Sequence, residues 1–389
     1  MEGPPQVTTH PAPRPDATDA NLLYSDIEEE LRTQVRALLA DRCPPQHLLA
    51  RVETDQVHDP KLWHALAKEL GVTALSVPEE LGGAGATWRE TALVLEELGR
   101  AAAPVPYLGS SVLATAALLA AQDTELLPAI ASGERTATLA VPFSTWPQAA
   151  YPGTVHITRD GLLNGTVTSV ADALSADTLL VPATGPDGPA LHAVDLTAAG
   201  DTVTRRAVVS LDLTRPLADL DLRSAPGTVL ATGEDAERVL RQALTAGAAL
   251  LASEQLGVAE WCLATTTAYV KDRHQFGRPV GSFQAVKHRL ADMWIAVTQA
   301  RAMARNAVAA LADASPQQAL ETALAQAYAS ETVVMVAEAA LQLHGGIGFT
   351  WEHPVHLYLK RAKSTSIALG TADRHRAALA RLADLPSTQ

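Results

Sequence analysis

Residues 268–293 read AYVKDRHQFGRPVGSFQAVKHRLADM, and this stretch decides the interpretation of the whole chain. It joins two long helical patterns, and a glycine and a proline interrupt it near its middle. An arginine in a last helical turn followed by such residues is typical of an ordinary helix end. The same stretch also has the makings of a binding site, because the planar guanidinium of Arg273 can form paired, charge-assisted hydrogen bonds with a pyrophosphate.

Three neighbours of Arg273 strengthen the binding interpretation. Gln275 offers amide donors and an acceptor, Phe276 offers a flat apolar surface, and Gly277 allows a tight backbone turn. Read alone, this block favours the helix end slightly. The sequence SFQAVKH that follows favours the binding site.

Outside this block, the pattern of apolar residues changes twice along the chain, from helical spacing to short strand-like runs and back. Residues 1–20 are rich in proline and are expected to form a disordered leader without the apolar core of a signal peptide. Residues 21–135 carry helical patterns, and residues 136–230 carry short runs rich in Val, Thr and Leu separated by turn residues. Residues 231–389 return to long helices. The predicted fold class is α+β, with an N-terminal helical domain, a small central β-barrel or sandwich, and a C-terminal four-helix bundle.

The helix limits follow from the apolar spacing and from the positions of proline and glycine. We expect helices from Ser25 to the Pro44-Pro45 pair and, in the C-terminal region, over residues 234–273, 283–312, 316–343 and 354–369.

Composition excludes several classes of function. The 389 residues carry a formal net charge of −13, which disfavours non-specific binding of nucleic acid. No run of about 20 uncharged apolar residues is present, so no membrane span is expected. Cys43 and Cys262 lie far apart and make no disulfide framework, which fits a reducing cytoplasm. His353 and His356 lack a nearby third ligand, so no metal site is expected.

The chain resembles the acyl-CoA dehydrogenase family from about Leu23 to Leu382. Four stretches carry the resemblance, and the two in the bundle are the most specific. They are GVTALSVPEELGGAGATWRETALVLEELGR at 71–100, LNGTVTSVADALSADTLLVPA at 163–183, the block at 268–293, and LQLHGGIGFTWEHPVHLYLKRAK at 341–363.

The resemblance implies a flavoenzyme that removes two hydrogens from the α and β carbons of an acyl-CoA, with FAD as the cofactor. In such an enzyme a carboxylate takes the α proton and the flavin takes the β hydride. The resemblance assigns FAD contacts to Arg273, Gln275, Phe276, Gln284, His288, Gln342, Gly345 and Gly346. It also implies an oligomer, usually a tetramer, in which Arg273 reaches the FAD of a neighbouring subunit, and an electron-transfer flavoprotein as electron acceptor.

Some of these positions also have plainer explanations. Gln284 and His288 lie four residues apart on one helix face, but a lone histidine is more often a surface or core residue. Gln342, Gly345 and Gly346 also fit a simple helix end.

The sequence departs from the family where the base and the thioester should be held. The family's glutamate before Gly-Thr corresponds to Leu369, and the other position used for the base corresponds to Gly247. The arginine that often accompanies that second position corresponds to Ala248. In the strand region, LAVPFSTWPQAAYPG at 139–153 replaces the usual Thr-Glu-Pro and Gly-Ser-Asp run, although Ser144 and Thr145 still offer hydroxyls.

Two carboxylates are candidates for a replacement base. Glu254 lies two turns beyond Gly247 on roughly the same helix face, and Asp373 follows the turn at Leu369. Each has a structural alternative that we favour, a polar contact within the bundle for Glu254 and an N-cap for Asp373.

Three functions remain open from sequence. The chain is a working acyl-CoA dehydrogenase subunit with an unusual base, or a partner subunit that completes the FAD site of an α2β2 heterotetramer, as in some actinobacterial members. The third possibility is a different oxidation on the same fold, with a carrier-bound or non-CoA substrate.

Overall fold

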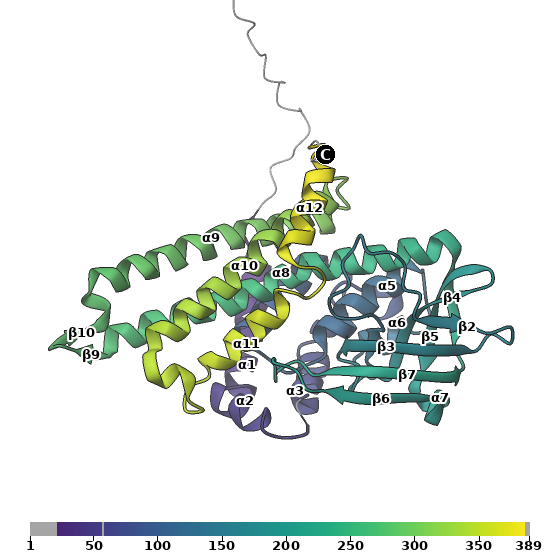
Figure 1. The fold of residues 1–389 in the computed structure, drawn as a ribbon, viewed down its shortest axis with the longest axis horizontal. Coiled ribbons are helices and arrows are strands. Elements are labelled where there is room, and N and C mark those ends of the chain that lie inside the picture. The colour runs from purple at the N-terminus through teal and green to yellow at the C-terminus, as the bar shows by residue number, and fades with distance from the viewer. Residues whose placement is uncertain (1–21, 57, 386–389) are drawn as a thin grey trace, which may run out of the picture.

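The computed structural model describes residues 22–56 and 58–385, so the leader expected at residues 1–20 lies outside the described residues. A helical region, a β-sheet and a second helical region follow one another along the chain, as predicted. The sheet lies at one end of the molecule, and the longest helix runs from the sheet to a small hairpin at the other end (Figure 1).

The N-terminal region consists of short helices. They are α1 Asp26–Arg42, α2 Pro45–Arg51, α3 Pro60–His64, α4 Trp88–Arg100, α5 Thr115–Ala120 and α6 Leu127–Ala131, with π-helical turns η1 Ala65–Glu69 and η4 Leu108–Ala114 and 3₁₀ turns η2 Val72–Ala74 and η3 Glu79–Leu81. Both α1 and α4 begin with a capping box, in which Ser25 or Thr87 accepts a backbone hydrogen bond and the glutamate three residues on returns one. The capping box at Ser25 explains why the sequence predicts the start of α1 correctly.

The central region is one mixed sheet of eight strands. The strands are β1 Ala137–Leu139, β2 Val155–Ile157, β3 Leu163–Ala171, β4 Thr178–Gly185, β5 Gly188–Asp195, β6 Val203–Val208, β7 Leu217–Ala225 and β8 Thr228–Thr232, and α7 Leu196–Ala199 and η5 Gly200–Thr202 follow β5. Pairing runs in the order β6-β7-β3-β2-β4-β5-β8, with β1 added parallel to β4. The β4–β5 register closes at Gly185 and Gly188 around the Pro186-Asp187 turn that the sequence indicates.

The C-terminal region is built on α8 Gly233–Asp272, whose 40 residues span about 60 Å. The elements after it are the hairpin β9 His274–Gln275 and β10 Arg278–Pro279, η6 Val280–Ser282, α9 Gln284–Ala312, α10 Gln318–His344, η7 Gly345–Phe349, α11 Val355–Thr365 and α12 Ala372–Leu382. The helix predicted over 354–369 is shorter than expected. It ends at Thr365 because Leu369 adopts a left-handed conformation, with φ +52°.

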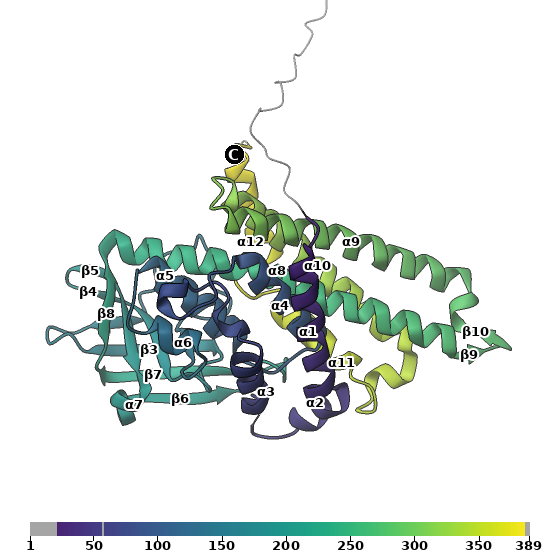
Figure 2. The same cartoon turned by 180° about the vertical axis from the view of Figure 1, so that it is seen from behind.

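Helix α8 is the axis on which both helical regions pack. It packs closely against α4, and the view from behind shows α4 beside α8 (Figure 2). A Cβ on Gly99 would lie 2.2 Å from the carbonyl oxygen of Glu254, and a Cβ on Gly257 would lie 1.8 Å from that of Glu96. Only glycine fits at these two points, so the crossing fixes how the N-terminal region sits on the bundle.

Helix α10 with its extension, Gln318–Phe349, is long and apolar enough to cross a membrane by length and composition alone. Half of its most apolar window is buried in the protein, where α10 packs against α8, α9, α11 and α12. A buried core helix has the same composition, so the fold accounts for the apolar sequence.

Candidate active site and nucleotide pocket

The two positions where the sequence lacks a catalytic glutamate meet in space. A Cβ built on Gly247 of α8 would lie 3.1 Å from Cδ1 of Leu369 and 2.3 Å from Cδ2 of Leu113 in η4. Leu369 and Leu113 are both buried, at 1% and 3% exposure. Gly247, Leu369 and Leu113 therefore form a closed apolar contact between α8, η4 and the turn after α11, with no acid side chain among them.

Hydrogen bonds hold the turn at Leu369 in its unusual conformation. The backbone N–H of Leu369 donates to the carbonyl of Phe143 at 2.8 Å, and Nε2 of the buried His375 donates to the carbonyl of Leu369 at 3.0 Å. A Cβ on Gly370, at φ +111°, would lie 2.8 Å from the Cβ of Trp146. The turn thus packs directly on the loop between β1 and β2, which contains the altered Ser144-Thr145 run.

A small cavity of about 340 Å³ lies between this loop and α8. Thr145 and Tyr151 line it from the loop, and Glu237, Arg241 and Leu244 line it from α8. Leu244 is one helical turn before Gly247, so the cavity adjoins the apolar contact of Gly247, Leu369 and Leu113. Of the two hydroxyl residues, Thr145 lines the cavity and is half-buried, while Ser144 is exposed.

Glu254 belongs to a buried ion-pair cluster and is not placed as a base. Its Oε2 is 2.5 Å from Nη2 of Arg215, and its Oε1 is 2.8 Å from Nε of Arg361. Burial alone would raise the pKa of Glu254, but the two guanidinium charges outweigh burial and lower the pKa to about 2. A carboxylate so firmly ionised accepts a proton poorly, and seven residues, or about 10 Å of helix, separate it from Gly247.

Asp373 is not placed as a base either. Its side chain is 92% exposed and pairs with Arg376, three residues on in α12. The predicted N-cap role is wrong, because Thr371 caps the helix by accepting the N–H of Arg374. Asp373 lies in the first turn, where a negative charge favours the helix dipole.

At the far end of α8, the residues of the sequence block at 268–293 form part of a pocket. Its volume is about 580 Å³, and Tyr269, Arg273, Gln275 and Val280 line it on one side, with His344, Gly345, Gly346 and Glu352 among those on the other. Gly345 has φ +63°, and a Cβ on Gly345 or Gly346 would meet nothing within 4 Å. The pocket thus combines a guanidinium, an amide and open glycine backbone, a donor set that suits the phosphates and hydroxyls of a dinucleotide.

The other predicted FAD contacts lie outside the residues that line this pocket. Phe276 is at the tip of the hairpin and 92% exposed, with its ring edge-on to Phe283. Gln284, His288 and Gln342 are exposed on α9 and α10. The chain by itself therefore brings together Arg273, Gln275, Gly345 and Gly346, and leaves the remaining four on open surface.

The two histidines that invite a metal interpretation contact different aromatic rings, since His356 lies edge-on to Trp351 and His353 belongs to a row of rings. His353 lies between His344 and Trp261, with ring centroids 4.4 and 6.4 Å away, and Trp261 stacks on Tyr358 at 3.5 Å. Burial lowers the pKa of His353 to about 4, so the ring is neutral near pH 7. In the part of the chain that the structure describes, no group of three or more His, Cys, Asp or Glu is arranged for a metal ion.

Comparison of the sequence with known proteins identifies the family. Residues 25–134 match the N-terminal domain model of acyl-CoA dehydrogenases, and residues 237–383 match the C-terminal domain model. The chain is 38% identical to "Acyl-CoA dehydrogenase IpdE2" of Mycolicibacterium smegmatis, over 89% of this chain and 95% of that protein. This chain belongs to the acyl-CoA dehydrogenase family. It is an acyl-CoA dehydrogenase or a subunit of one.

Two solved structures are similar to this chain over nearly their whole length. The ChsE4-ChsE5 complex from Mycobacterium tuberculosis aligns with a TM-score of 0.83 and 32% identity, covering 94% of this chain and 100% of the matched one. A variant of the Tcur3481-Tcur3483 steroid acyl-CoA dehydrogenase aligns with a TM-score of 0.82 and 32% identity, covering 92% of this chain and 98% of the matched one.

Sequence reasoning missed three residues at the site. Arg215 and Arg361, which hold Glu254, lie 39 and 107 residues from it in the chain. Leu113, which fills the space beside Gly247, belongs to a uniformly apolar helical run. A single sequence carries no local signal for such long-range partners.

Proposed function

We propose that this chain is the FAD-binding, base-deficient subunit of a mixed acyl-CoA dehydrogenase tetramer, and that a homologous partner subunit supplies the catalytic carboxylate. The observation that carries the proposal is the apolar contact of Gly247, Leu369 and Leu113. Both places where the family keeps its base fall in this one contact. The two other carboxylates that the sequence offers, Glu254 and Asp373, are paired with arginines, so neither replaces the base in this contact.

The pocket at the β9–β10 hairpin fits the nucleotide part of FAD. Arg273 would hold the pyrophosphate, Gln275 would hydrogen-bond to the nucleotide, and the backbone of Gly345 and Gly346 would approach it closely. Bound FAD supplies the hydride acceptor for dehydrogenation. The exposed Gln284 would meet the cofactor only in an assembly, and Phe276, His288 and Gln342 are exposed in the same way.

The length of α8 argues that one chain does not hold a whole FAD by itself. Arg273 and Gly247 are 26 residues apart on or at the end of this helix (273 − 247 = 26), which is about 39 Å. That separation exceeds the length of a flavin dinucleotide. If the flavin ring lies beside the Leu369 turn, the nucleotide pocket that serves it belongs to another subunit, and each pocket of this chain serves a neighbour's cofactor.

The relatives support the assembly and the substrate class. Each of the two solved relatives is named after two proteins, Tcur3481-Tcur3483 and ChsE4-ChsE5, and the second is described as a complex. The other is called a "steroid ACAD", which makes steroid acyl-CoA thioesters the first substrates to test. We further propose an electron-transfer flavoprotein as acceptor and the cytoplasm as location, which the two free, buried cysteines favour.

Purification of the chain alone and together with a homologous acyl-CoA dehydrogenase subunit encoded beside it tests the proposal. The expected result is a mixed tetramer by light scattering, FAD in its absorption spectrum, and turnover of acyl-CoA thioesters by the mixture only. A homo-oligomer of this chain that turns over an acyl-CoA would overturn the proposal.

A further inference from the structure

Four charged side chains are buried together where α8, α11 and the segment between β6 and β7 meet. We call Asp212, Arg215, Glu254 and Arg361 the joint cluster, and each is at most 3% exposed. The two arginines and two acids balance in charge. None of them takes part in the nucleotide pocket or in the Gly247–Leu369–Leu113 contact, so the proposed function leaves the cluster unused.

The geometry of the joint cluster is tight and connects three elements. Glu254 on α8 bridges Arg215 of the β6–β7 segment, at 2.5 Å, and Arg361 of α11, at 2.8 Å. Nη1 of Arg361 donates to Oγ1 of Thr214 at 2.8 Å, and that hydroxyl donates to Asp212 at 2.6 Å. The cluster therefore clamps the sheet region to two helices of the bundle.

Arg215 extends this clamp to the loop between β1 and β2. Its guanidinium carbon lies 5.4 Å from the ring centroid of Phe143, within range of a cation–π contact. The backbone of Phe143 donates to the carbonyl of Ser169 and accepts the N–H of Leu369. A continuous chain of contacts thus runs from Glu254 through Arg215 and Phe143 to the left-handed turn at Leu369.

Packing alone gives little reason for charges at this place. A buried ion-pair cluster can often be replaced by well-packed apolar side chains with no loss of stability, because desolvation of the charges offsets their attraction. Directed contacts, by contrast, fix the relative placement of the groups that they join. Arg215 lies over the ring of Phe143, and the carbonyl of Phe143 accepts the N–H of Leu369. These directed contacts therefore fix the placement of the turn at Leu369.

We propose that the joint cluster is a positioning device, in which Arg215 acts through Phe143 to hold the turn at Leu369 against the β1–β2 loop. Under the proposed function, the flavin ring lies beside the Leu369 turn. The flavin part of the inference rests on that function, whereas the positioning of the Leu369 turn does not.

Hydrogen exchange at the backbone amide of Leu369 reports on this positioning directly, with or without cofactor. The test variant removes all four charges at once, as Asp212→Asn, Arg215→Met, Glu254→Leu and Arg361→Met. The melting temperature is expected to stay within a few degrees of wild type, while exchange at Leu369 quickens by about tenfold as the cation–π contact is lost. Unchanged protection of that amide in a folded variant would overturn the proposal.

A second variant, Phe143→Leu, keeps every charge and removes only the ring that Arg215 faces. Faster exchange at Leu369, with the joint cluster intact, is expected here as well. If protection is unchanged in this variant, the link through Phe143 is wrong even where the four-residue variant fails to fold.

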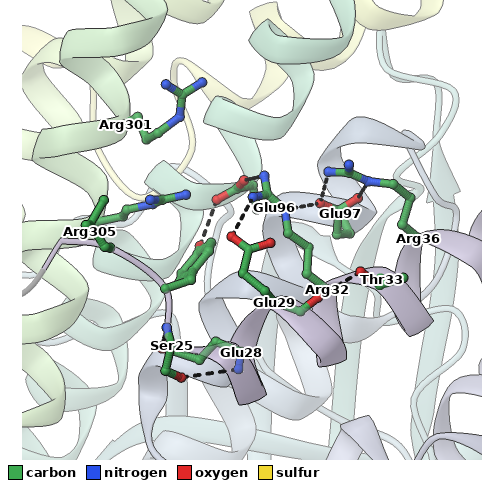
Figure 3. A network of polar contacts seen from close by, with 12 residues as sticks. Ser25, Glu28, Glu29, Arg32, Thr33, Arg36, Glu96, Glu97, Arg301 and Arg305 are labelled. Carbon is green, nitrogen blue, oxygen red and sulfur yellow. Dashed lines mark hydrogen bonds and ion pairs between the residues drawn. The ribbon is translucent and has the colours of Figure 1, made fainter.

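The chain offers a matched control in a second buried carboxylate held by two arginines. Glu97 of α4 is 1% exposed and binds Arg32 at 3.0 Å and Arg36 at 2.6 Å, both from α1 (Figure 3). It belongs to a separate network that includes Glu96 and Tyr24. Glu97→Gln is expected to lower the melting temperature and leave exchange at Leu369 unchanged, and an equal rise in exchange would show a general loosening that contradicts a specific positioning role.

A final measurement separates this inference from the proposed function. FAD affinity of the assembled protein is expected to fall by about tenfold in the four-residue variant, and in the control to stay at the wild-type value. If wild type binds no FAD, the proposed function fails, but the exchange experiment still decides the positioning of the turn.

Discussion

Leu369 and Gly247 are the residues on which the functional argument depends. The sequence shows that neither is an acid, but it does not show that they touch. The structure adds that Leu113 and Leu369 both pack against Gly247, so apolar side chains and not an empty pocket occupy this place. A carboxyl introduced into this contact would be buried without a hydrogen-bond partner, which costs free energy of folding.

Substitution of Leu369 by Glu tests how closed this contact is. We expect the free energy of unfolding to fall by about 2–4 kcal/mol, because the new carboxyl is buried without a partner. Leu369→Met, which keeps the volume, should cost less than about 1.5 kcal/mol. Urea unfolding of both variants makes the comparison, and equal stability of Leu369→Glu and wild type would show a roomy, hydrated site instead.

The candidate FAD residues could be predicted from sequence only in part. The block at 268–293 and the LQLHGG stretch are far apart in the chain, yet Arg273, Gln275, Gly345 and Gly346 line one pocket. Phe276 and Gln284 belong to the same stretches, but a second subunit would have to cover them. Sequence motifs identify such residues, whereas their distribution between two subunits depends on assembly.

Arg273 and Arg278 provide a matched pair on the β9–β10 hairpin. Arg273 lines the nucleotide pocket, whereas Arg278 lies 3.9 Å over the ring of Phe283. Arg273→Met should weaken FAD binding by about 10- to 100-fold, the equivalent of one to two charge-assisted hydrogen bonds. Arg278→Met should leave FAD affinity unchanged, and fluorescence titration of the assembled protein distinguishes the two results; an equal loss in both would contradict the assigned pocket.

At the scale of elements, helix limits were predictable where a cap or a proline marks them. Ser25 and Thr87 carry capping boxes, and α8 to α10 begin and end within two residues of the predicted limits. The end of α11 was not predictable. Its helical pattern continues to Leu369, and only the long-range hydrogen bond from Leu369 to Phe143 shows why the helix stops early. The pairing order of the sheet is likewise set by long-range contacts, which a single sequence does not reveal.

The attachment of α1 to α4 should depend on pH. Burial raises the pKa of Glu96 to about 7, with the charge of Glu260 adding to the rise and that of Arg32 opposing it. The folded protein then binds a proton that the unfolded chain releases near pH 4.5, so this stabilisation is complete below pH 4.5 and is lost as the pH rises through 7.

Glu96→Gln isolates this effect. In wild type, Glu96 should make unfolding easier at pH 8 than at pH 5 by about 2 kcal/mol. Gln resembles the protonated glutamate, so the variant should lack that part of the pH dependence. The two proteins should have similar stability at pH 5, and the variant should be the more stable one at pH 8. Urea unfolding at pH 5, 6.5 and 8 measures it. Parallel pH profiles for the two proteins would contradict a raised pKa at Glu96.

At the scale of the whole molecule, the nucleotide pocket lies at the C-terminal end of α8, whereas the apolar contact of Leu369 involves Gly247, 26 residues before Arg273. The surface near the pocket and along α9 also exposes large apolar side chains, among them Phe276 at 92%, Trp294 at 61% and Phe349 at 70%. Such exposure is typical of a surface that a partner covers. Both observations favour an assembly in which subunits complete one another's cofactor sites.

Trp294→Glu on the open face of α9 tests the assembly. A charge at a covered apolar position should shift the mass in solution from tetramer toward smaller species. Val209→Glu, at a fully exposed valine between β6 and β7, serves as the control and should leave the mass unchanged. Light scattering of both variants gives the answer, and an unchanged tetramer for Trp294→Glu would place the interface elsewhere.

The most direct test of the account follows the colour of the flavin when an acyl-CoA thioester is added without oxygen. Proton removal and hydride transfer together bleach the oxidised flavin, whereas binding alone does not. We predict that FAD bound to assemblies of this chain alone stays oxidised, and that FAD in the mixed assembly with a base-bearing partner is bleached by the same thioester. Bleaching by this chain alone would show that it carries its own base, and would contradict the proposal that a partner subunit supplies the carboxylate.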